Sequence, residues 1–183
     1  MLILASKSPR RKELLSLITT DFVIKTTDED ETLPDGISPK EAVETLSKIK
    51  ALPFKNGVDT VIGADTVVAI DGKILGKPKD ESDAFDMLRT LSGRTHSVFT
   101  GVTVISPKGE TTFSVETKVK FFELSDYEIR AYISTGEPMD KAGAYGIQQK
   151  GALLVESVGG DYFNVVGLPV SKLNKVLNIH IDH

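Results

Sequence analysis

The sequence predicts an α/β fold in which a mixed, twisted sheet is flanked by helices around a central cleft. Short β-branched, apolar segments alternate along the chain with segments whose apolar residues recur at helical spacing. Capping boxes and glycine or proline breaks separate these segments. A chain of 183 residues fits one domain, expected over residues 1–183, with enough length to bury a real core.

The first half of the chain predicts three strands and three helices. Ser8-Pro9 is typical of a helix start, because Pro is favoured at the first helical position. Ser38–Glu41 forms a capping box, and Asp71-Gly72 predicts a hairpin turn. The expected strands are Leu2–Ala5, Phe22–Lys25 and Asp59–Ile70, and the expected helices begin at Pro9, run from Pro39 to about Ala51 and span about Glu81–Leu91.

The second half predicts a hairpin of two longer strands, followed by shorter elements. A second capping box at Ser125–Glu128 opens a short helix that ends by Gly136. Gly159–Asn164 is interpreted as a turn before a last strand. The remaining expected elements are strands at Ser97–Ile105, Thr111–Phe122 and Leu153–Val158, and a final helix at Pro169–Leu177.

Composition excludes several kinds of chemistry. The chain has no cysteine, which rules out disulfides, thiolate zinc sites and a cysteine nucleophile. A net charge of −4 argues against binding to a nucleic-acid polymer, because such binding depends on neutralising phosphates. No segment has the length of a membrane span, and basic residues follow the apolar run Leu2–Ala5 instead of preceding it. We therefore expect a cytoplasmic protein with no membrane partner.

Two segments carry charge where ordinary folding does not need it. Ser6–Lys12 places Arg10 and Arg11 in the first turn of a helix, which predicts either a phosphate-binding turn or a solvated basic turn. Asp65 lies inside the apolar run Val61–Val68. A carboxylate there must face a cleft or a cation, or else cap nearby backbone N–H groups.

Three further segments leave their chemistry open. Lys77, in Gly76–Asp80, has a charge suited to phosphate but alone is typical of a surface lysine. The acidic run Asp28–Glu31 is either a solvated loop or a site for Mg²⁺. Glu137–Gln148 is either a base-reading loop, through the amide of Gln148, or a packed loop with an Asp140–Lys141 contact. His96 is interpreted as a hydrogen-bonded structural histidine.

Six segments together resemble the Maf family of nucleotide pyrophosphatases. They occur in family order and cover nearly the whole chain: SKSPRRK at Ser6–Lys12, GADTVV at Gly63–Val68, GKPKD at Gly76–Asp80, SGRTHSVFTGV at Ser92–Val102, EPMDKAGAYGIQ at Glu137–Gln148 and NVVGLP at Asn164–Pro169. The resemblance implies an inosine-triphosphatase-like fold. It also implies hydrolysis of a nucleoside triphosphate between the α- and β-phosphates, with a divalent metal, Mg²⁺ or Mn²⁺, and frequent dimerisation, so that a homodimer is one expected assembly.

The resemblance also assigns residues. It implies that Asp65 is the proton acceptor, and that Glu31 helps Asp65 to hold the metal. Arg10, Thr66 and Gln148 fall on the family's specificity positions and match the branch that acts on dTTP and UTP. The remaining implied phosphate-binding or active-site residues are Arg11, Lys50 and Lys77.

Three functions remain open at this point. The favoured one is a dTTP/UTP pyrophosphatase that removes unwanted nucleotides or balances their pools. A modified pyrimidine triphosphate would suit the same residues. The alternative from a different class is a nucleotide-binding regulator of cell division or septum formation, because a phosphate-binding turn explains binding without requiring hydrolysis.

Overall fold

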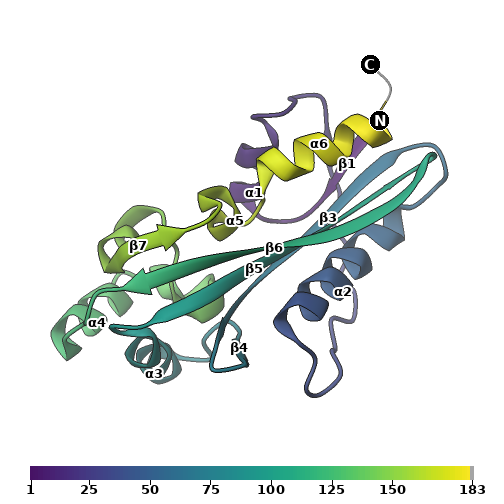
Figure 1. The fold of residues 1–183 in the computed structure, drawn as a ribbon. Helices are drawn as coiled ribbons and strands as arrows, with labels where there is room; N and C mark the ends of the chain where they lie inside the picture. The colour runs from purple at the N-terminus through teal and green to yellow at the C-terminus, as the bar shows by residue number, and fades with distance from the viewer. Residues whose placement is uncertain (182–183) are drawn as a thin grey trace.

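A seven-stranded mixed sheet forms the centre of the computed structural model, which describes residues 1–181 (Figure 1). The order is β2-β1-β3-β5-β6-β7, with β4 paired to β3. β1 runs parallel to β2 and β3, and the other pairs are antiparallel. The strands are β1 (Leu2–Ala5), β2 (Val23–Ile24), β3 (Thr60–Ile70), β4 (Lys73–Leu75), β5 (Thr95–Ser106), β6 (Gly109–Phe121) and β7 (Val155–Gly159). The predicted fold class is confirmed.

The helices divide between the two faces of the sheet. The α-helices are α1 (Pro9–Leu15), α2 (Pro39–Ala51), α3 (Glu81–Leu91), α4 (Asp126–Ile133), α5 (Tyr162–Val166) and α6 (Val170–His180). The short 3₁₀ helices within residues 1–181 are η1 (Leu52–Phe54), η2 (Glu137–Asp140), η3 (Ala142–Ala144) and η4 (Gln149–Leu154). Figure 1 shows α2 along one side of the long strands and α6 along the other. No helix in the described part of the chain is long and apolar enough to span a membrane.

Alternation along the strands builds a separate core on each face. Ile3 and Val61 point toward α2 and join a small cluster with Ala51 of that helix. Leu4 and Ile62, their immediate neighbours, join the larger core on the opposite face. Residues that α3, α4 and α6 contribute to this larger core include Leu88, Leu91, Ile129, Ile133, Leu173 and Leu177.

A gap at one edge of β3 positions the candidate site. On this edge, β1 pairs with β3 only as far as Gly63, and β4 pairs with it only from Val68 onward. No strand in the described residues pairs with Ala64–Val67 on that side. The polar residues Asp65 and Thr66 lie in this interval. The chain leaves β1 at Ala5 and turns into α1 beside the gap, which brings the basic segment to the two polar residues.

The predicted capping boxes and hairpin turn are confirmed, as are the helix starts at Pro9, Pro39 and Glu81. Ser38 and Ser125 each exchange hydrogen bonds with a glutamate three residues later. Ser8 caps α1. Asp71 and Gly72 both adopt positive φ between β3 and β4, as a tight hairpin requires.

Other predicted boundaries differ from the structure. The two long strands extend to residues 95–106 and 109–121, so that only Pro107 and Lys108 form the turn. The strand expected at Leu153 begins at Val155, because η4 continues through Leu154. α6 runs to His180, three residues beyond the predicted end.

The predicted turn and last strand around Gly159–Asn164 are wrong. Gly159 belongs to β7, and Asp161 caps α5 because its carboxylate accepts from the backbone N–H groups of Phe163 and Asn164. The chain then passes through Gly167 into α6 without a further strand.

Candidate active site

A cavity of about 820 Å³ opens at the gap in the edge of β3. Its walls come from the turn after β1, the middle of β3, the end of α2, the segment 26–31 and the segments 140–149 and 165–167. The structure brings all the residues proposed from sequence to this cavity. They are Arg10, Arg11, Glu31, Lys50, Asp65, Thr66, Lys77 and Gln148.

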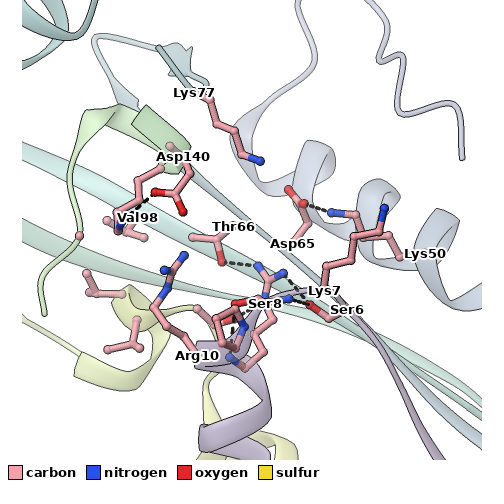
Figure 2. Close-up of a pocket in the computed structure, with 18 of the residues that line it drawn as sticks. Ser6, Lys7, Ser8, Arg10, Lys50, Asp65, Thr66, Lys77, Val98 and Asp140 are labelled. Carbon is pink, nitrogen blue, oxygen red and sulfur yellow. Dashed lines mark hydrogen bonds and ion pairs between the residues drawn. The ribbon is translucent and has the colours of Figure 1, made fainter. Parts of the chain in front are cut away.

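Asp65 lies on the α2 side of the cavity and is paired with a cation. Its carboxylate accepts a hydrogen bond from the ammonium group of Lys50, which α2 carries in its last turn (Figure 2). The same ammonium group lies 3.4 Å from a carboxylate oxygen of Glu31. The Asp65 side chain keeps 14% of its surface exposed. It therefore has a cation partner and still reaches the cavity, which separates it from a carboxylate that only caps backbone N–H groups.

Thr66 lies on the opposite face of the sheet, because neighbouring strand residues point in opposite directions. Its Oγ1 accepts a hydrogen bond from Nη2 of Arg11 at 3.0 Å. Arg11 is itself fixed, because its Nε donates to the Gly167 carbonyl at 2.8 Å and its Nη1 to Ser6 Oγ at 3.4 Å. Burial lowers the pKa of Arg11, whereas the nearby charge of Asp65 acts in the opposite direction.

Three of the other cavity side chains make no hydrogen bond or ion pair in the described part of the protein. Neither a hydrogen bond nor an ion pair engages the side chains of Arg10, Lys77 or Gln148 there. Figure 2 shows Lys77 and Arg10 extending from opposite sides toward the space beside Asp65 and Thr66. Because their hydrogen-bonding capacity is unused, these groups are available to a ligand.

Glu137 fixes the loop that carries Gln148. One carboxylate oxygen accepts from the hydroxyl of Tyr132 at 2.9 Å and from the backbone N–H of Gly151 at 3.1 Å. The other oxygen accepts from the backbone N–H of Lys150 at 3.3 Å. The Tyr132 hydroxyl in turn accepts from the backbone N–H of Gly146 at 3.2 Å. The loop is therefore held on both sides of Gln148, whose side chain faces the cavity.

The predicted contact between Asp140 and Lys141 is present at 2.9 Å, and it lowers the pKa of Asp140. The packed loop and a Gln148 side chain that lines the cavity thus occur together. In the acidic run, the hydrogen bond from Lys7 at 2.6 Å lowers the pKa of Asp28. This segment forms one wall of the cavity without regular secondary structure.

The interpretation of His96 is confirmed. It is 2% exposed, and its Nε2 lies 2.6 Å from the hydroxyl oxygen of Tyr145. Desolvation lowers the pKa of His96 to about 4, so the ring is neutral at pH 7.

Sequence analysis did not identify two supports of the site. The Gly167 carbonyl anchors Arg11, and Thr100 contacts Thr66 across the strands. Both residues lie in segments quoted for the resemblance, NVVGLP and SGRTHSVFTGV. Their contacts span 156 and 34 residues, so no local pattern could have revealed them.

The carboxylates at the cavity suit a metal ion that is bound partly by the protein and partly by a ligand. The described residues contain no group of three or more His, Cys, Asp or Glu that could enclose a metal ion. Glu31 and Asp65 instead converge on the same ammonium group, and both line the cavity. Mg²⁺ commonly binds through one or two carboxylates together with substrate phosphates and water. Two carboxylates beside an open cavity fit this kind of site.

This chain is similar to known proteins over nearly its whole length. A family profile described as "Maf-like protein" matches residues 1–180. A dTTP/UTP pyrophosphatase of Bacillus pumilus (strain SAFR-032) is 54% identical over 178 residues, which cover 96% of this chain and 94% of that protein. A dTTP/UTP pyrophosphatase of Geobacillus sp. (strain WCH70) is 54% identical over 173 residues, covering 93% of each. One of Bacillus cereus (strain AH187) is 47% identical over 187 residues, covering 100% of this chain and 98% of that protein.

A solved structure is also similar to part of the chain. The structure of the Staphylococcus aureus Ham1 protein aligns with 66% of this chain and 71% of that chain, at 15% identity and a TM-score of 0.47.

Proposed function

We propose that this chain, which belongs to the Maf family, hydrolyses dTTP and UTP to the nucleoside monophosphate and pyrophosphate. The proposal rests on the Asp65 carboxylate, which is paired with Lys50 at a cavity where the side chains of Arg10 and Lys77 are free to bind a nucleotide. The volume of about 820 Å³ falls in the range of small-molecule sites. The names of the relatives at 47–54% identity support the same substrates.

In the proposed reaction, Asp65 acts as general base. A water molecule attacks the α-phosphorus and gives one proton to the Asp65 carboxylate while its oxygen forms the new bond. The bond between the α-phosphorus and the bridging oxygen breaks, and that oxygen leaves with pyrophosphate. Lys50 supports this role because its ammonium group fixes the position of the carboxylate.

Cations in the cavity would balance the charge of the triphosphate. Lys77 has no partner in the described residues and reaches into the cavity, so its charge can be used on a phosphate oxygen. Arg11 keeps two of its five N–H groups after its three internal bonds. Preorganised cations of this kind stabilise the negative charge that develops on the leaving pyrophosphate.

We assign recognition of the pyrimidine ring to Arg10, Thr66 and Gln148. The Gln148 amide offers two donors and an acceptor, and it is held on a fixed loop. A base that fails to match buried polar groups leaves them unpaired, which is a strong means of discrimination.

Glu31 and Asp65 would hold the divalent metal together with phosphate oxygens. When bound, Mg²⁺ or Mn²⁺ supplies positive charge to the phosphates and orients the triphosphate. The dimeric assembly implied by the family remains a prediction that light scattering of the purified protein would check.

A nucleotide panel tests the proposed function. The purified protein is given UTP, dTTP, CTP, GTP and modified pyrimidine triphosphates with Mg²⁺, with Mn²⁺ or with EDTA, and pyrophosphate and orthophosphate are detected separately. We expect metal-dependent release of pyrophosphate alone, fastest from dTTP, UTP or a modified pyrimidine triphosphate. Release of orthophosphate would contradict cleavage between the α- and β-phosphates. Tight binding of UTP without turnover would instead support a nucleotide-binding regulator.

A further inference from the structure

A row of three oxygen atoms leads from Thr66, at the cavity, into the buried interior. Thr66 and Thr100 are direct partners across β3 and β5, and their Oγ1 atoms lie 2.8 Å apart. Thr100 Oγ1 lies 2.9 Å from the backbone carbonyl oxygen of Asn164, in α5. Thr100 and Asn164 have no exposed surface, so water does not compete for these hydrogen bonds.

Each hydroxyl group has only one proton, and this fixes the direction of every hydrogen bond along the row. A carbonyl oxygen only accepts, so Thr100 must donate its single hydroxyl proton to Asn164. Thr100 then has no proton left for Thr66. In the contact between the two hydroxyl groups, Thr66 is therefore the donor and Thr100 the acceptor.

The far end of the row cannot easily move. The side-chain amide of Asn164 donates to the Val98 carbonyl at 3.2 Å and to Thr117 Oγ1 at 3.0 Å. The Thr117 hydroxyl group donates its own hydrogen bond to the Asp161 carbonyl oxygen at 2.8 Å. Because Asn164 is anchored on both β5 and β6, its carbonyl stays in place for Thr100.

Arg11 completes the arrangement from the other side. Its Nη2 donates to Thr66 Oγ1 at 3.0 Å, and a guanidinium group can never accept. The Thr66 hydroxyl group thus donates its one hydrogen bond to Thr100 and accepts one hydrogen bond from Arg11 through one of its two lone pairs. One lone pair remains, so Thr66 can meet a ligand in the cavity only as a hydrogen-bond acceptor.

We infer that Thr100 is a positioning residue that fixes Thr66 as an acceptor and thereby makes the cavity favour uracil and thymine over cytosine. The inference rests on the proposed function, and specifically on Thr66 meeting the pyrimidine edge. Uracil and thymine carry a proton on ring nitrogen N3, which an acceptor satisfies. Cytosine carries a lone pair on N3, which would face the remaining lone pair of Thr66 and leave both unpaired.

Thr100→Val tests the inference, because it removes the hydroxyl group while keeping the branched shape. The Thr66 proton then loses its buried acceptor and can turn toward the cavity, where it can meet the lone pair of cytosine. We measure kcat/KM for UTP and CTP and take their ratio. The wild type should prefer UTP, and Thr100→Val should lower the ratio at least about fivefold, which is the effect of one ordinary hydrogen bond.

Two controls separate this effect from damage to the fold. Thr100→Ser retains the hydroxyl group and should restore the wild-type ratio. Thr103→Val makes the same chemical change on the same strand, at a buried threonine that contacts Ser47 and Thr112 instead. It should leave the ratio unchanged even if it lowers stability. Should Thr100→Val fail to fold, Thr100→Ala carries the same test, because it also lacks the hydroxyl group.

The possible results distinguish the inference from the proposed function. A wild type that hydrolyses UTP and CTP equally well, or a Thr100→Val ratio equal to that of Thr103→Val, overturns the role of Thr100 and leaves the pyrophosphatase activity standing. A wild type that turns over no nucleotide overturns both.

Discussion

Asp65 and Thr66 are adjacent in the chain but work on opposite faces of the sheet. Asp65 meets Lys50 on the α2 side, and Thr66 meets Arg11 and Thr100 on the other. Because no described strand covers this stretch of β3 at the gap, both side chains reach one cavity. A single dipeptide can thus present a base to the reacting phosphate and a hydroxyl group to another part of the ligand.

Gln148→Ala should affect the choice of base and leave stability unchanged. Its side chain makes no hydrogen bond within the described residues, so truncation breaks no internal hydrogen bond. We expect the preference for dTTP and UTP over the other triphosphates to fall at least about fivefold, as the loss of one hydrogen bond to the ligand would cause. Kinetics on the nucleotide panel and the melting temperature check this together. An unchanged ranking of substrates would remove Gln148 from base recognition.

His96 should make the protein less stable in mild acid. Burial lowers the pKa of His96 to about 4, below the ordinary value of 6.5, so the unfolded chain binds the proton more readily than the folded one. Stability is therefore lost as the pH falls from 6.5 toward 4. Between pH 7 and pH 5, the loss attributable to this residue should be about 2 kcal/mol.

Urea unfolding of the wild type and of His96→Gln at both pH values measures this loss. The comparison isolates His96 from His180, whose pKa is also lowered, mainly by burial. The wild type should lose more stability than the variant between the two pH values. Equal losses in the two proteins would show that His96 already accepts a proton in the folded state.

Two glycines determine the position of α2 against the sheet. A Cβ atom at Gly63 would lie 2.1 Å from the Ser47 carbonyl oxygen, and one at Gly101 would lie 2.2 Å from the Val43 carbonyl oxygen. Both distances are far shorter than any real contact, so only glycine allows the helix to approach β3 and β5 this closely. The close approach also brings Lys50 to Asp65.

Gly101→Ala should therefore weaken both the fold and the activity. We expect a loss of about 1–3 kcal/mol in the free energy of unfolding, as for other overpacked sites, and slower release of pyrophosphate, because α2 must move away with Lys50. Gly159→Ala is the matched control, since a Cβ atom there would only touch Lys118 at 3.9 Å. If the two variants were equally stable and active, the packing of α2 would not set the geometry of the site.

Local signals explain why many elements could be predicted. The capping boxes at Ser38 and Ser125 and the turn at Asp71-Gly72 depend on contacts within four residues, which the sequence displays directly. The start of α5 also depends on a local contact, because Asp161 caps the helix. The sequence nevertheless predicts a turn and a strand there, because the glycines before Asp161 are typical of a turn and the β-branched residues after it are typical of a strand.

The site itself could be predicted as a set of residue types but not as an arrangement. Asp65 is a candidate because a charged side chain inside an apolar run needs a cleft or a cation. The role of Lys50 comes only from the resemblance. The direction of the hydrogen bonds around Thr66 depends on Thr100 and Asn164, which are 34 and 98 positions away in the chain. Only the packing of α5 against β5 reveals it.

The cavity is lined by segments that lie far apart in the chain. Ser6–Arg11 contribute from the first turn after β1, and Val165–Gly167 contribute from the end of α5. The bond from Arg11 to the Gly167 carbonyl joins these ends directly. Neither half of the described chain therefore contains a complete site, and a single domain over residues 1–183 stays a prediction.

Pyrophosphate release by Asp65→Asn tests whether Asp65 is the general base. Asparagine keeps the size of the side chain but cannot take the proton of the attacking water. With UTP and a divalent metal, we expect the variant to lose at least about a hundredfold in kcat, the lower range for loss of a general base, while circular dichroism and UTP binding show a folded, binding protein. Turnover near the wild-type rate in that variant would contradict the account, because the proton would then have to pass to another group.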